Sequence, residues 1–454
     1  MLTKIEIDGF KTFENFELEL RPFSAIVGPN ASGKSNLFDA LRFLSLLAKH
    51  DIRTAIQDLR GEPEELFRLT NTRQYDKMRF AIEVVLDQHG SDSFGKQYVI
   101  KAQRIRYELE LVIKTDAKNQ PKGIFVTREE CKAISKKQDG AVFLRGSNIS
   151  YSSRANPFIE TKESGDGEAT AFQIRQDGPI GESGATKRGR PVTLPAIEAS
   201  RTALSTITTA EFPHLYALRN LLMSTRFLEI NPQAARKPSD RFESKELRPD
   251  ASNLAAVLAY LKEATGTEHR PEGVISDISM DLASLIPSVR SVNVFNDSNA
   301  KEYSFGVAAS EKLQFSSRVI SDGTLRLLAL LAILDDPNRK GILCFEEPEN
   351  GVHEGRIPAL VQLLRDSVSN PDLIGKEPLF QVLINTHSPA VMESLDDHEI
   401  IAADSVTVID QTHRAKSTKT RMRTGVRSRL ELDPEKDLTR QEVKKILRRP
   451  SDEA

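Results

Sequence analysis

The residues with the clearest chemical meaning form a short glycine-bearing loop, Gly28-Pro29-Asn30-Ala31-Ser32-Gly33-Lys34-Ser35. The loop matches the pattern GxxxxGK[ST], in which backbone NH groups surround a phosphate at the N-terminus of a helix. We expect Lys34 to reach the β- and γ-phosphates and the Ser35 hydroxyl to bind Mg²⁺. A chance match is the alternative, but an apolar strand pattern precedes this loop and a helical pattern follows it. The loop therefore predicts that the chain binds ATP or GTP.

Two adjacent carboxylates, Glu346 and Glu347, end an apolar run that starts at Ile342. Such a run is typical of a buried central strand that delivers acidic side chains to the C-terminal edge of a parallel sheet, where ligands bind. We expect Glu346 to lie on the metal side and Glu347 to act as a general base on the attacking water. The alternative is a strand that ends in a solvated acidic turn. The phosphate-binding loop elsewhere in the chain favours the catalytic interpretation.

Two further segments could contact a γ-phosphate. Ser321-Asp322-Gly323 precedes a very apolar helical pattern, and a helix N-terminus favours an anion. His387 follows the apolar strand pattern 380–384, and an imidazole can donate a hydrogen bond to a phosphate oxygen. The alternatives are an ordinary helix start and a histidine that bonds a neighbouring backbone carbonyl.

Taken in their order along the chain, these motifs resemble those of one protein family. The segment Ile320-Ser321-Asp322-Gly323-Thr324 resembles the signature loop of ABC-type ATPases, and the whole set is similar to their RecF, SMC and OLD-type branch. The likeness rests on Ile7-Asp8-Gly9-Phe10-Lys11, Gly33-Lys34-Ser35-Asn36, Phe345-Glu346-Glu347-Pro348-Glu349 and Asn385-Thr386-His387-Ser388-Pro389. It covers residues 1 to about 90 and about 300 to 410.

The resemblance implies an ATPase head that works in pairs, with ATP and Mg²⁺ bound between two copies. One copy would use Lys34, and the other would supply Ser321 and the NH of Gly323. The implied nucleotide-binding residues are Gly28, Asn30, Gly33, Lys34, Ser35, Asn36, Ser321 and Gly323. The implied catalytic residues are Glu347, Glu346 and the switch histidine His387, and the implied metal ligands are Ser35 and Glu346.

Two departures from the family pattern concern the metal. Most ABC and SMC heads end the strand with Asp-Glu, whereas this chain has Glu346-Glu347, as OLD-type ATPases often do, so the metal contact could run through water. The family also uses a glutamine near Mg²⁺, and Gln57, Gln74 and Gln88 all remain candidates. Residues 349–353 occupy the place of the family's dimer-facing D-loop, with a plain turn as the alternative.

The pattern along the chain predicts an α/β fold with a parallel sheet core, an N-terminal antiparallel β subdomain and a mixed insertion. We expect an N-terminal lobe at 1–115 and a C-terminal lobe at 301–410, both belonging to the ATPase head. Between them, residues 116–300 form an insertion, irregular to about 200 and helical afterwards, and residues 411–454 form a basic tail. Alternating runs within residues 2–20 predict a β-hairpin, and no apolar heptad persists long enough for a coiled coil.

Composition sets outer limits on the function. The 454 residues are 39% hydrophobic and 28% charged, which is typical of a soluble globular protein. The longest apolar runs, 254–261 and 327–334, are too short to span a bilayer, and the two cysteines lie far apart in the chain. We therefore expect a reducing, cytoplasmic setting and no membrane contact.

The segment 411–430 holds seven basic residues and no acidic one. They are Arg414, Lys416, Lys419, Arg421, Arg423, Arg427 and Arg429. Such a run could neutralise DNA phosphates. The alternative is the solvated face of an edge hairpin, because the pattern at 406–409 predicts a strand just before it.

The expected function is an ATP-hydrolysing homodimer, or higher homo-oligomer, that controls a separate effector or a DNA transaction. By resemblance alone, the effector would be a nuclease or toxin, and the setting DNA repair or anti-phage defence. Three alternatives remain: a non-catalytic ATP-dependent switch or clamp, the nucleotide-binding subunit of a transporter, and a DNA-binding structural module.

Overall fold

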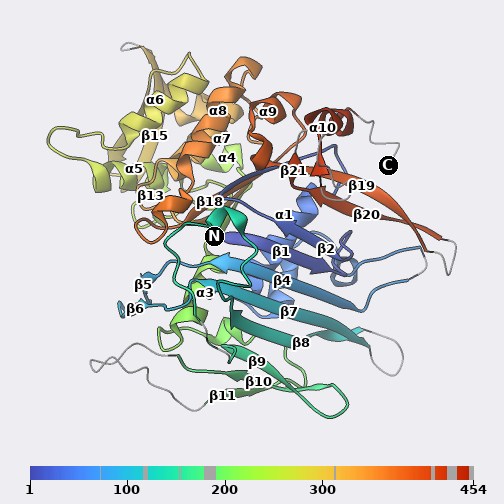
Figure 1. Cartoon of the computed structure of the whole chain (residues 1–454). Helices are drawn as coiled ribbons and strands as arrows, with labels where there is room; N and C mark the ends of the chain where they lie inside the picture. Colours follow the sequence, from blue (N-terminus) through green and yellow to red (C-terminus); the bar gives the residue numbers. More distant parts are fainter. Residues whose placement is uncertain are drawn as a thin grey trace.

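The structure is a computed structural model, and it describes residues 1–71, 73–115, 121–152, 154, 156–177, 191–310, 313–410, 415–426 and 437–448. Two large sheets organise these residues (Figure 1). The first is antiparallel, in the order β11-β10-β9-β8-β7-β4-β1-β2. Its strands are β1 (Leu2–Asp8), β2 (Phe16–Glu19), β4 (Lys77–Val85), β7 (Arg104–Thr115), β8 (Pro121–Ala133), β9 (Ile159–Glu163), β10 (Ala169–Ile174) and β11 (Val192–Pro195).

The second sheet has the order β12-β17-β18-β3-β19-β20. All its neighbours are parallel except the edge strand β20. Its strands are β12 (Thr225–Leu228), β17 (Gly341–Glu346), β18 (Phe380–Thr386), β3 (Phe23–Val27), β19 (Ile400–Asp410) and β20 (Ala415–Arg423). Alternate residues of the central strands point into two different apolar cores, so both faces of this sheet are covered.

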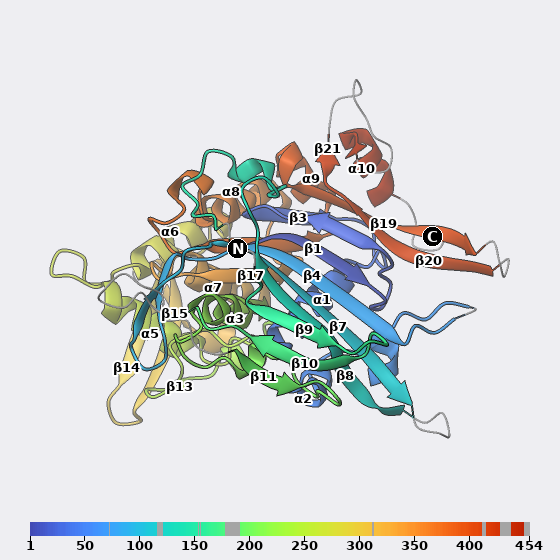
Figure 2. The same ribbon diagram turned by 60° about the horizontal axis from the view of Figure 1, so that its bottom comes forward.

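Helices separate and cover the sheets. One core packs α1 (Lys34–Leu47), α2 (Ile52–Gln57) and α3 (Pro213–Met223) against the antiparallel sheet and one face of the parallel sheet. The other core packs α5 (Leu254–Thr265), α6 (Ile275–Leu285), α7 (Asp322–Leu334), α8 (Ile357–Ser367), α9 (Pro389–Ser394) and α10 (Arg440–Leu447) on the far face. Figure 2 shows the same layers from below the antiparallel sheet.

A smaller sheet lies beside α5 and α6 and consists of β13 (Ser239–Asp240), β14 (Ser291–Asp297), β15 (Glu302–Ser310) and β16 (Leu313–Ser316). The remaining α-helix is α4 (Pro232–Ala235), and the remaining strands form the short pairs β5 (His89–Ser91) with β6 (Gln97–Val99) and β21 (Gly425–Val426) with β22 (Asp437–Leu438). The longest helix in the described part of the chain is α1, with 14 residues. Long helical arms are therefore absent from the described residues.

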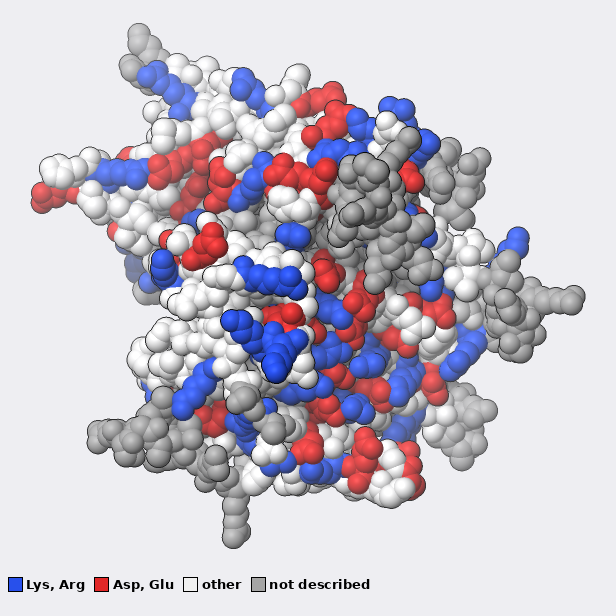
Figure 3. Space-filling view, viewed as in Figure 1, with Lys and Arg blue, Asp and Glu red and all other residues white. Residues whose placement is uncertain are grey.

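Several expectations from the sequence are confirmed. The fold is α/β with a parallel core, β1 and β2 form the opening hairpin, and β4 pairs with β7 in antiparallel register. Charged side chains line the exposed face of the antiparallel sheet, where Arg106 bonds Glu6, Glu83 and Glu108. The hydrogen bond from Arg106 lowers the pKa of Glu6 to about 2. Figure 3 shows basic and acidic side chains interleaved over this sheet, as expected for a solvated face.

The expectation of an irregular segment from 116 to about 200 is wrong in part, because some of its described residues form regular strands. Four strands, β8 to β11, extend the antiparallel sheet there. These strands lie toward one edge of the sheet, and few of their side chains are fully buried, so their sequence lacks a sustained apolar alternation. The division of the chain into four ranges stays a prediction.

Gln381 joins the two sheets. Its side chain is fully buried in β18, and its amide nitrogen donates to the backbone carbonyls of Leu2 and Arg21, at 2.8 Å each. Its amide oxygen accepts from the Leu2 nitrogen at 2.8 Å. One side chain thus satisfies three backbone groups of the opening strands.

We predict that Gln381→Leu lowers the free energy of unfolding by about 3 kcal/mol or more, because it leaves three buried backbone groups unpaired and each costs roughly 1 to 3 kcal/mol. Urea denaturation followed by circular dichroism measures the change. Gln57→Leu, at an exposed position at the end of α2, is the matched control and should change little. Equal midpoints for both variants would contradict the role given to Gln381.

Candidate functional site

The phosphate-binding loop lies where the sequence predicts it, between β3 and the start of α1. Ala31 and Gly33 adopt left-handed backbone conformations, with φ of 63° and 87°, which curl the loop. A Cβ at Gly33 would overlap the Thr420 side chain, so this close approach requires glycine. Asn30 is exposed at the tip of the loop.

Lys34 begins α1 and is buried. Its ammonium donates to the carbonyls of Gly28 and Pro29, at 2.8 and 2.6 Å. Burial lowers the pKa of Lys34 to about 8, although the nearby carboxylates Glu347, Glu346 and Glu349 act in the opposite direction. A cation partly withdrawn from water beside three acids interacts strongly with any further charge that enters the site.

Three consecutive residues at and directly after the C-terminal end of β18 bind three carboxylates at and just after the end of β17. Asn385 donates to Glu346 Oε1 at 3.1 Å, and the Thr386 hydroxyl donates to Glu349 Oε1. The imidazole of His387 bonds Glu347 Oε1 at 2.9 Å through Nδ1. The parallel pairing of β17 with β18 sets this alignment, because it places Glu346 directly beside Asn385. We call these three hydrogen bonds the carboxylate ladder.

Glu347 has a distinctive backbone and accessible side chain. Its φ of 47° is unusual for a residue other than glycine. The backbone nitrogen donates to the Asn385 carbonyl at 2.9 Å, and the second carboxylate oxygen accepts from Asn350 at 2.8 Å. The side chains of Glu347 and His387 are 36% and 47% exposed. Both groups can therefore reach a ligand above the sheet edge.

Ser321 and Gly323 lie at the start of α7, as predicted. The Ser321 hydroxyl accepts from the Thr324 nitrogen and caps the helix. The backbone of Gly323 packs directly on Gly351, so neither position has room for a Cβ. Among the hydrogen bonds of the described residues, none joins Ser321 or Gly323 to the phosphate-binding loop.

A second group of contacts near the loop was not predicted. Asn36 donates to the Thr12 hydroxyl at 2.8 Å, and Thr12 bonds the Thr420 hydroxyl at 2.7 Å. Lys11 donates to Asp39 of α1 at 2.6 Å. The opening hairpin, the edge strand β20 and α1 thus meet beside the loop. Ser35 is half-buried in the first turn of α1, and its pairing with Glu346 on a metal stays a prediction.

The basic segment is partly an edge strand, in agreement with the alternative interpretation. Lys416, Lys419, Arg421 and Arg423 lie on β20, and the two arginines bond Asp404 of β19. Arg414, Arg427 and Arg429 lie outside the described residues. DNA binding by this segment stays a prediction.

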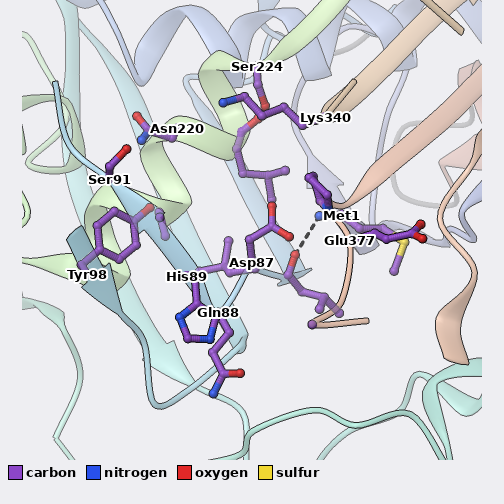
Figure 4. Close-up of a pocket in the computed structure, with 18 of the residues that line it drawn as sticks. Met1, Asp87, Gln88, His89, Ser91, Tyr98, Asn220, Ser224, Lys340 and Glu377 are labelled. Carbon is purple, nitrogen blue, oxygen red and sulfur yellow. Dashed lines mark hydrogen bonds between the residues drawn. The ribbon is translucent and has the colours of Figure 1, made fainter. Parts of the chain in front are cut away.

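The three candidate glutamines are dispersed. Gln57 ends α2, and Gln74 is exposed near the Glu64 carbonyl. Gln88 bonds Ser150 and lines a cavity of about 500 Å³ beside the first residue of β17 (Figure 4). This cavity, which also contacts Asp87 and Tyr98, lies at the opposite end of β17 from Glu346. Gln88 is therefore not a residue of the predicted nucleotide site.

The fold and the site define a P-loop nucleotide-binding head of the ABC type. A curled loop, a buried lysine and carboxylates at the adjoining strand end form a donor set that fits a magnesium nucleotide. No helix of the described residues has the length and apolar character needed to cross a membrane.

Comparisons with known proteins agree with this class. A family model described as "AAA ATPase domain" matches residues 1–172. A second, described as "AAA domain, putative AbiEii toxin, Type IV TA system", matches residues 203–393. Chromosome partition protein Smc of Methanocaldococcus jannaschii is 52% identical over 44 residues, covering 10% of this chain and 4% of that protein. DNA replication and repair protein RecF of Acaryochloris marina is 31% identical over 104 residues, covering 22% and 26%.

A solved SmcHead, bound to the C-winged helix domain of ScpA, aligns over 92% of this chain and 97% of its own, at 14% identity and a TM-score of 0.47. The matches to the two sequence relatives span about a quarter of their length or less. The family models and these relatives together identify the chain as an ABC-type ATPase head of the RecF and SMC branch.

We predict that nucleotide binding takes up a proton at Lys34. With a pKa of about 8, the lysine is about half protonated at pH 8, and the phosphates restore the missing proton. Affinity for MgADP should then fall about tenfold between pH 7 and pH 9. Calorimetry at pH 8 in two buffers of different ionisation enthalpy should report uptake of about half a proton per chain. Equal heats in the two buffers would contradict the prediction. Lys34→Ala is the control, because it removes the group that takes up the proton.

Proposed function

We propose that this chain hydrolyses ATP in a head-to-tail dimer and thereby controls a partner effector or a DNA transaction. The carboxylate ladder, together with the buried Lys34, is the observation that carries the proposal. A head that only bound nucleotide would not need a strand-end carboxylate oriented by a histidine beside the phosphate-binding loop.

Each residue has a distinct task in this proposal. The loop backbone and Lys34 bind the phosphates, while Ser35 and Glu346 hold Mg²⁺. The metal ion, when bound, neutralises negative charge on the phosphate oxygens. Glu347 accepts the proton of the attacking water. His387 orients Glu347 through Nδ1, and its other ring nitrogen donates a hydrogen bond to the γ-phosphate. The exposure of Glu347 and His387 supports these tasks.

The pairing of two chains follows from the position of the signature loop. Ser321 is exposed at the N-terminus of α7, where backbone NH groups favour an anion, and it has no hydrogen bond to the loop of its own chain among the described contacts. A second copy can bring its phosphate-binding loop to this surface. Charge stabilisation supplied by another chain raises rates by about 10³ to 10⁵ in related phosphoryl transfers.

The proposal extends to the biological process in which the ATPase acts. The relatives named for chromosome partition and for DNA replication and repair support a DNA transaction. The family description that names a type IV toxin–antitoxin system supports a defence role with a separate effector. The strand-end pair Glu346-Glu347 supports a likeness to OLD-type ATPases.

Two alternatives differ in what they require. A non-catalytic switch would bind ATP and dimerise without turnover. A transporter subunit would have a short insertion and no opening hairpin at Phe10, whereas this chain has both the hairpin and strands β8 to β11 within the insertion. The proposal therefore favours an ATPase over a transporter subunit.

We predict that Glu347→Gln keeps ATP binding, lowers ATP turnover at least about 100-fold and increases the dimer population, because general-base catalysis contributes roughly 10² to 10⁴ in rate. Phosphate release and size-exclusion light scattering with Mg²⁺ and ATP measure the two effects. Glu354→Gln, an exposed glutamate seven positions later, is the control and should behave like the parent. Parental turnover in Glu347→Gln would exclude Glu347 as the base.

We predict that Ser321→Arg abolishes ATP-dependent dimerisation and leaves nucleotide affinity of the single chain within about twofold. The added bulk and charge would block a partner's γ-phosphate, whereas Ser321 makes no hydrogen bond with the chain's own phosphate-binding loop among the described contacts. Light scattering and equilibrium binding of a fluorescent nucleotide separate the two effects. Ser298→Arg, in the exposed turn between β14 and β15, should dimerise normally. Dimer formation by Ser321→Arg at the parental level would refute the two-chain site.

A further inference from the structure

Glu349 is a buried acid with an unusual set of contacts. It lies two residues after Glu347, and only 9% of it is exposed. One carboxylate oxygen accepts from the Thr386 hydroxyl, and the other has no hydrogen-bond partner among the described residues. Burial raises the pKa of Glu349, and Glu347 raises it further, whereas the Thr386 hydrogen bond and His387 lower it. Burial of such a group is unfavourable, so a compensating role is expected.

Thr386, the hydrogen-bond partner of Glu349, lies next to His387. Thr386 is fully buried at the end of β18, directly before His387. Its hydroxyl donates to Glu349 and accepts from the Ser388 nitrogen at 2.9 Å, directly after His387. One hydroxyl thus fixes the backbone across the histidine. The Thr386 carbonyl also accepts from the Gly28 nitrogen of the phosphate-binding loop at 3.2 Å.

The direction of the hydroxyl depends on Glu349. A hydroxyl has one proton, and when the proton points at the carboxylate, a lone pair stays available for the Ser388 NH. Without that acceptor, the proton can rotate toward other oxygens and weaken the turn that carries His387. Because His387 bonds Glu347, a change in this turn moves the proposed general base.

We propose that Glu349 is a positioning residue that acts through Thr386 to orient the His387–Glu347 pair and so sets the rate of ATP hydrolysis. The inference rests on the proposed ATPase function. It concerns turnover and not nucleotide affinity, because neither Glu349 nor the Thr386 side chain belongs to the loop that surrounds the phosphates. The charged groups that face Glu349 are Lys34 of α1, Glu347 after β17 and His387 after β18.

Two pairs of matched substitutions test the hydrogen bond. Thr386→Val keeps the shape and removes the hydroxyl, whereas Thr386→Ser keeps the hydroxyl. Glu349→Leu removes the acceptor, whereas Glu349→Gln keeps an oxygen that can accept. We expect Thr386→Val and Glu349→Leu to lower kcat about tenfold with KM for ATP changed less than about twofold, as for loss of one oriented hydrogen bond. Thr386→Ser and Glu349→Gln should stay within about threefold of the parent.

A background without the histidine separates positioning from general damage. In His387→Ala, the Glu349→Leu change should cost no further turnover, because the group through which it acts is gone. An additional tenfold loss in that background, or parental kcat in both Thr386→Val and Glu349→Leu, would overturn the inference. Thermal unfolding identifies any variant that fails to fold, and the Thr386 pair then carries the test alone.

A measurement without ATP distinguishes this inference from the proposed function. Hydrogen exchange of the Ser388 amide should accelerate about tenfold in Thr386→Val and in Glu349→Leu, and not in Thr386→Ser. Unchanged exchange in both variants would overturn the positioning role whether or not the chain hydrolyses ATP. If the parent shows no turnover above Lys34→Ala, the proposed ATPase function fails, while the exchange result still tests the Glu349–Thr386 contact.

Discussion

The placement of β18 between β3 and β17 is the constraint on which the rest of the site depends. Parallel pairing brings the C-terminal ends of all three strands to one edge. There β3 leads into the phosphate-binding loop, β17 ends at the carboxylates, and β18 ends at Asn385 and Thr386, directly before His387. A shift of β18 by one residue would reverse its buried faces and remove every bond of the carboxylate ladder. The same apolar residues that stabilise the sheet therefore also fix the chemistry.

The opposite half of β18 joins this edge of the parallel sheet to the antiparallel sheet. Gln381 satisfies backbone groups on β1 and in the turn before β3, so the opening hairpin cannot separate from the parallel sheet without leaving buried groups unpaired. At its other end the hairpin reaches the first turn of α1, directly after the phosphate-binding loop, through Thr12 and Asn36. The N-terminal hairpin is thus anchored at two points, one of them beside the proposed site.

Local sequence patterns predicted the parts of this protein that local physics determines. The glycine and lysine spacing of the loop, the apolar strand before Glu346 and the helix after Ser321 all appear as expected. The contacts that pair Thr386 with Glu349, or Thr420 with Gly33, join residues distant in the chain, and no periodicity encodes them. Strands β8 to β11 were missed because half-exposed strands at a sheet edge carry polar residues on both faces.

One contact relates the proposed partner-facing surface to the proposed base of the same chain. The backbone of Gly323 packs on Gly351 without room for a Cβ, so the start of α7 and the turn after β17 cannot move independently. Asn350, adjacent to Gly351, donates to the carboxylate of Glu347. A second copy that engages Ser321 would press on this turn, and the displacement would reach Glu347 through one residue. In the proposed dimer, the geometry of the proposed base would then respond to nucleotide held by the neighbouring copy.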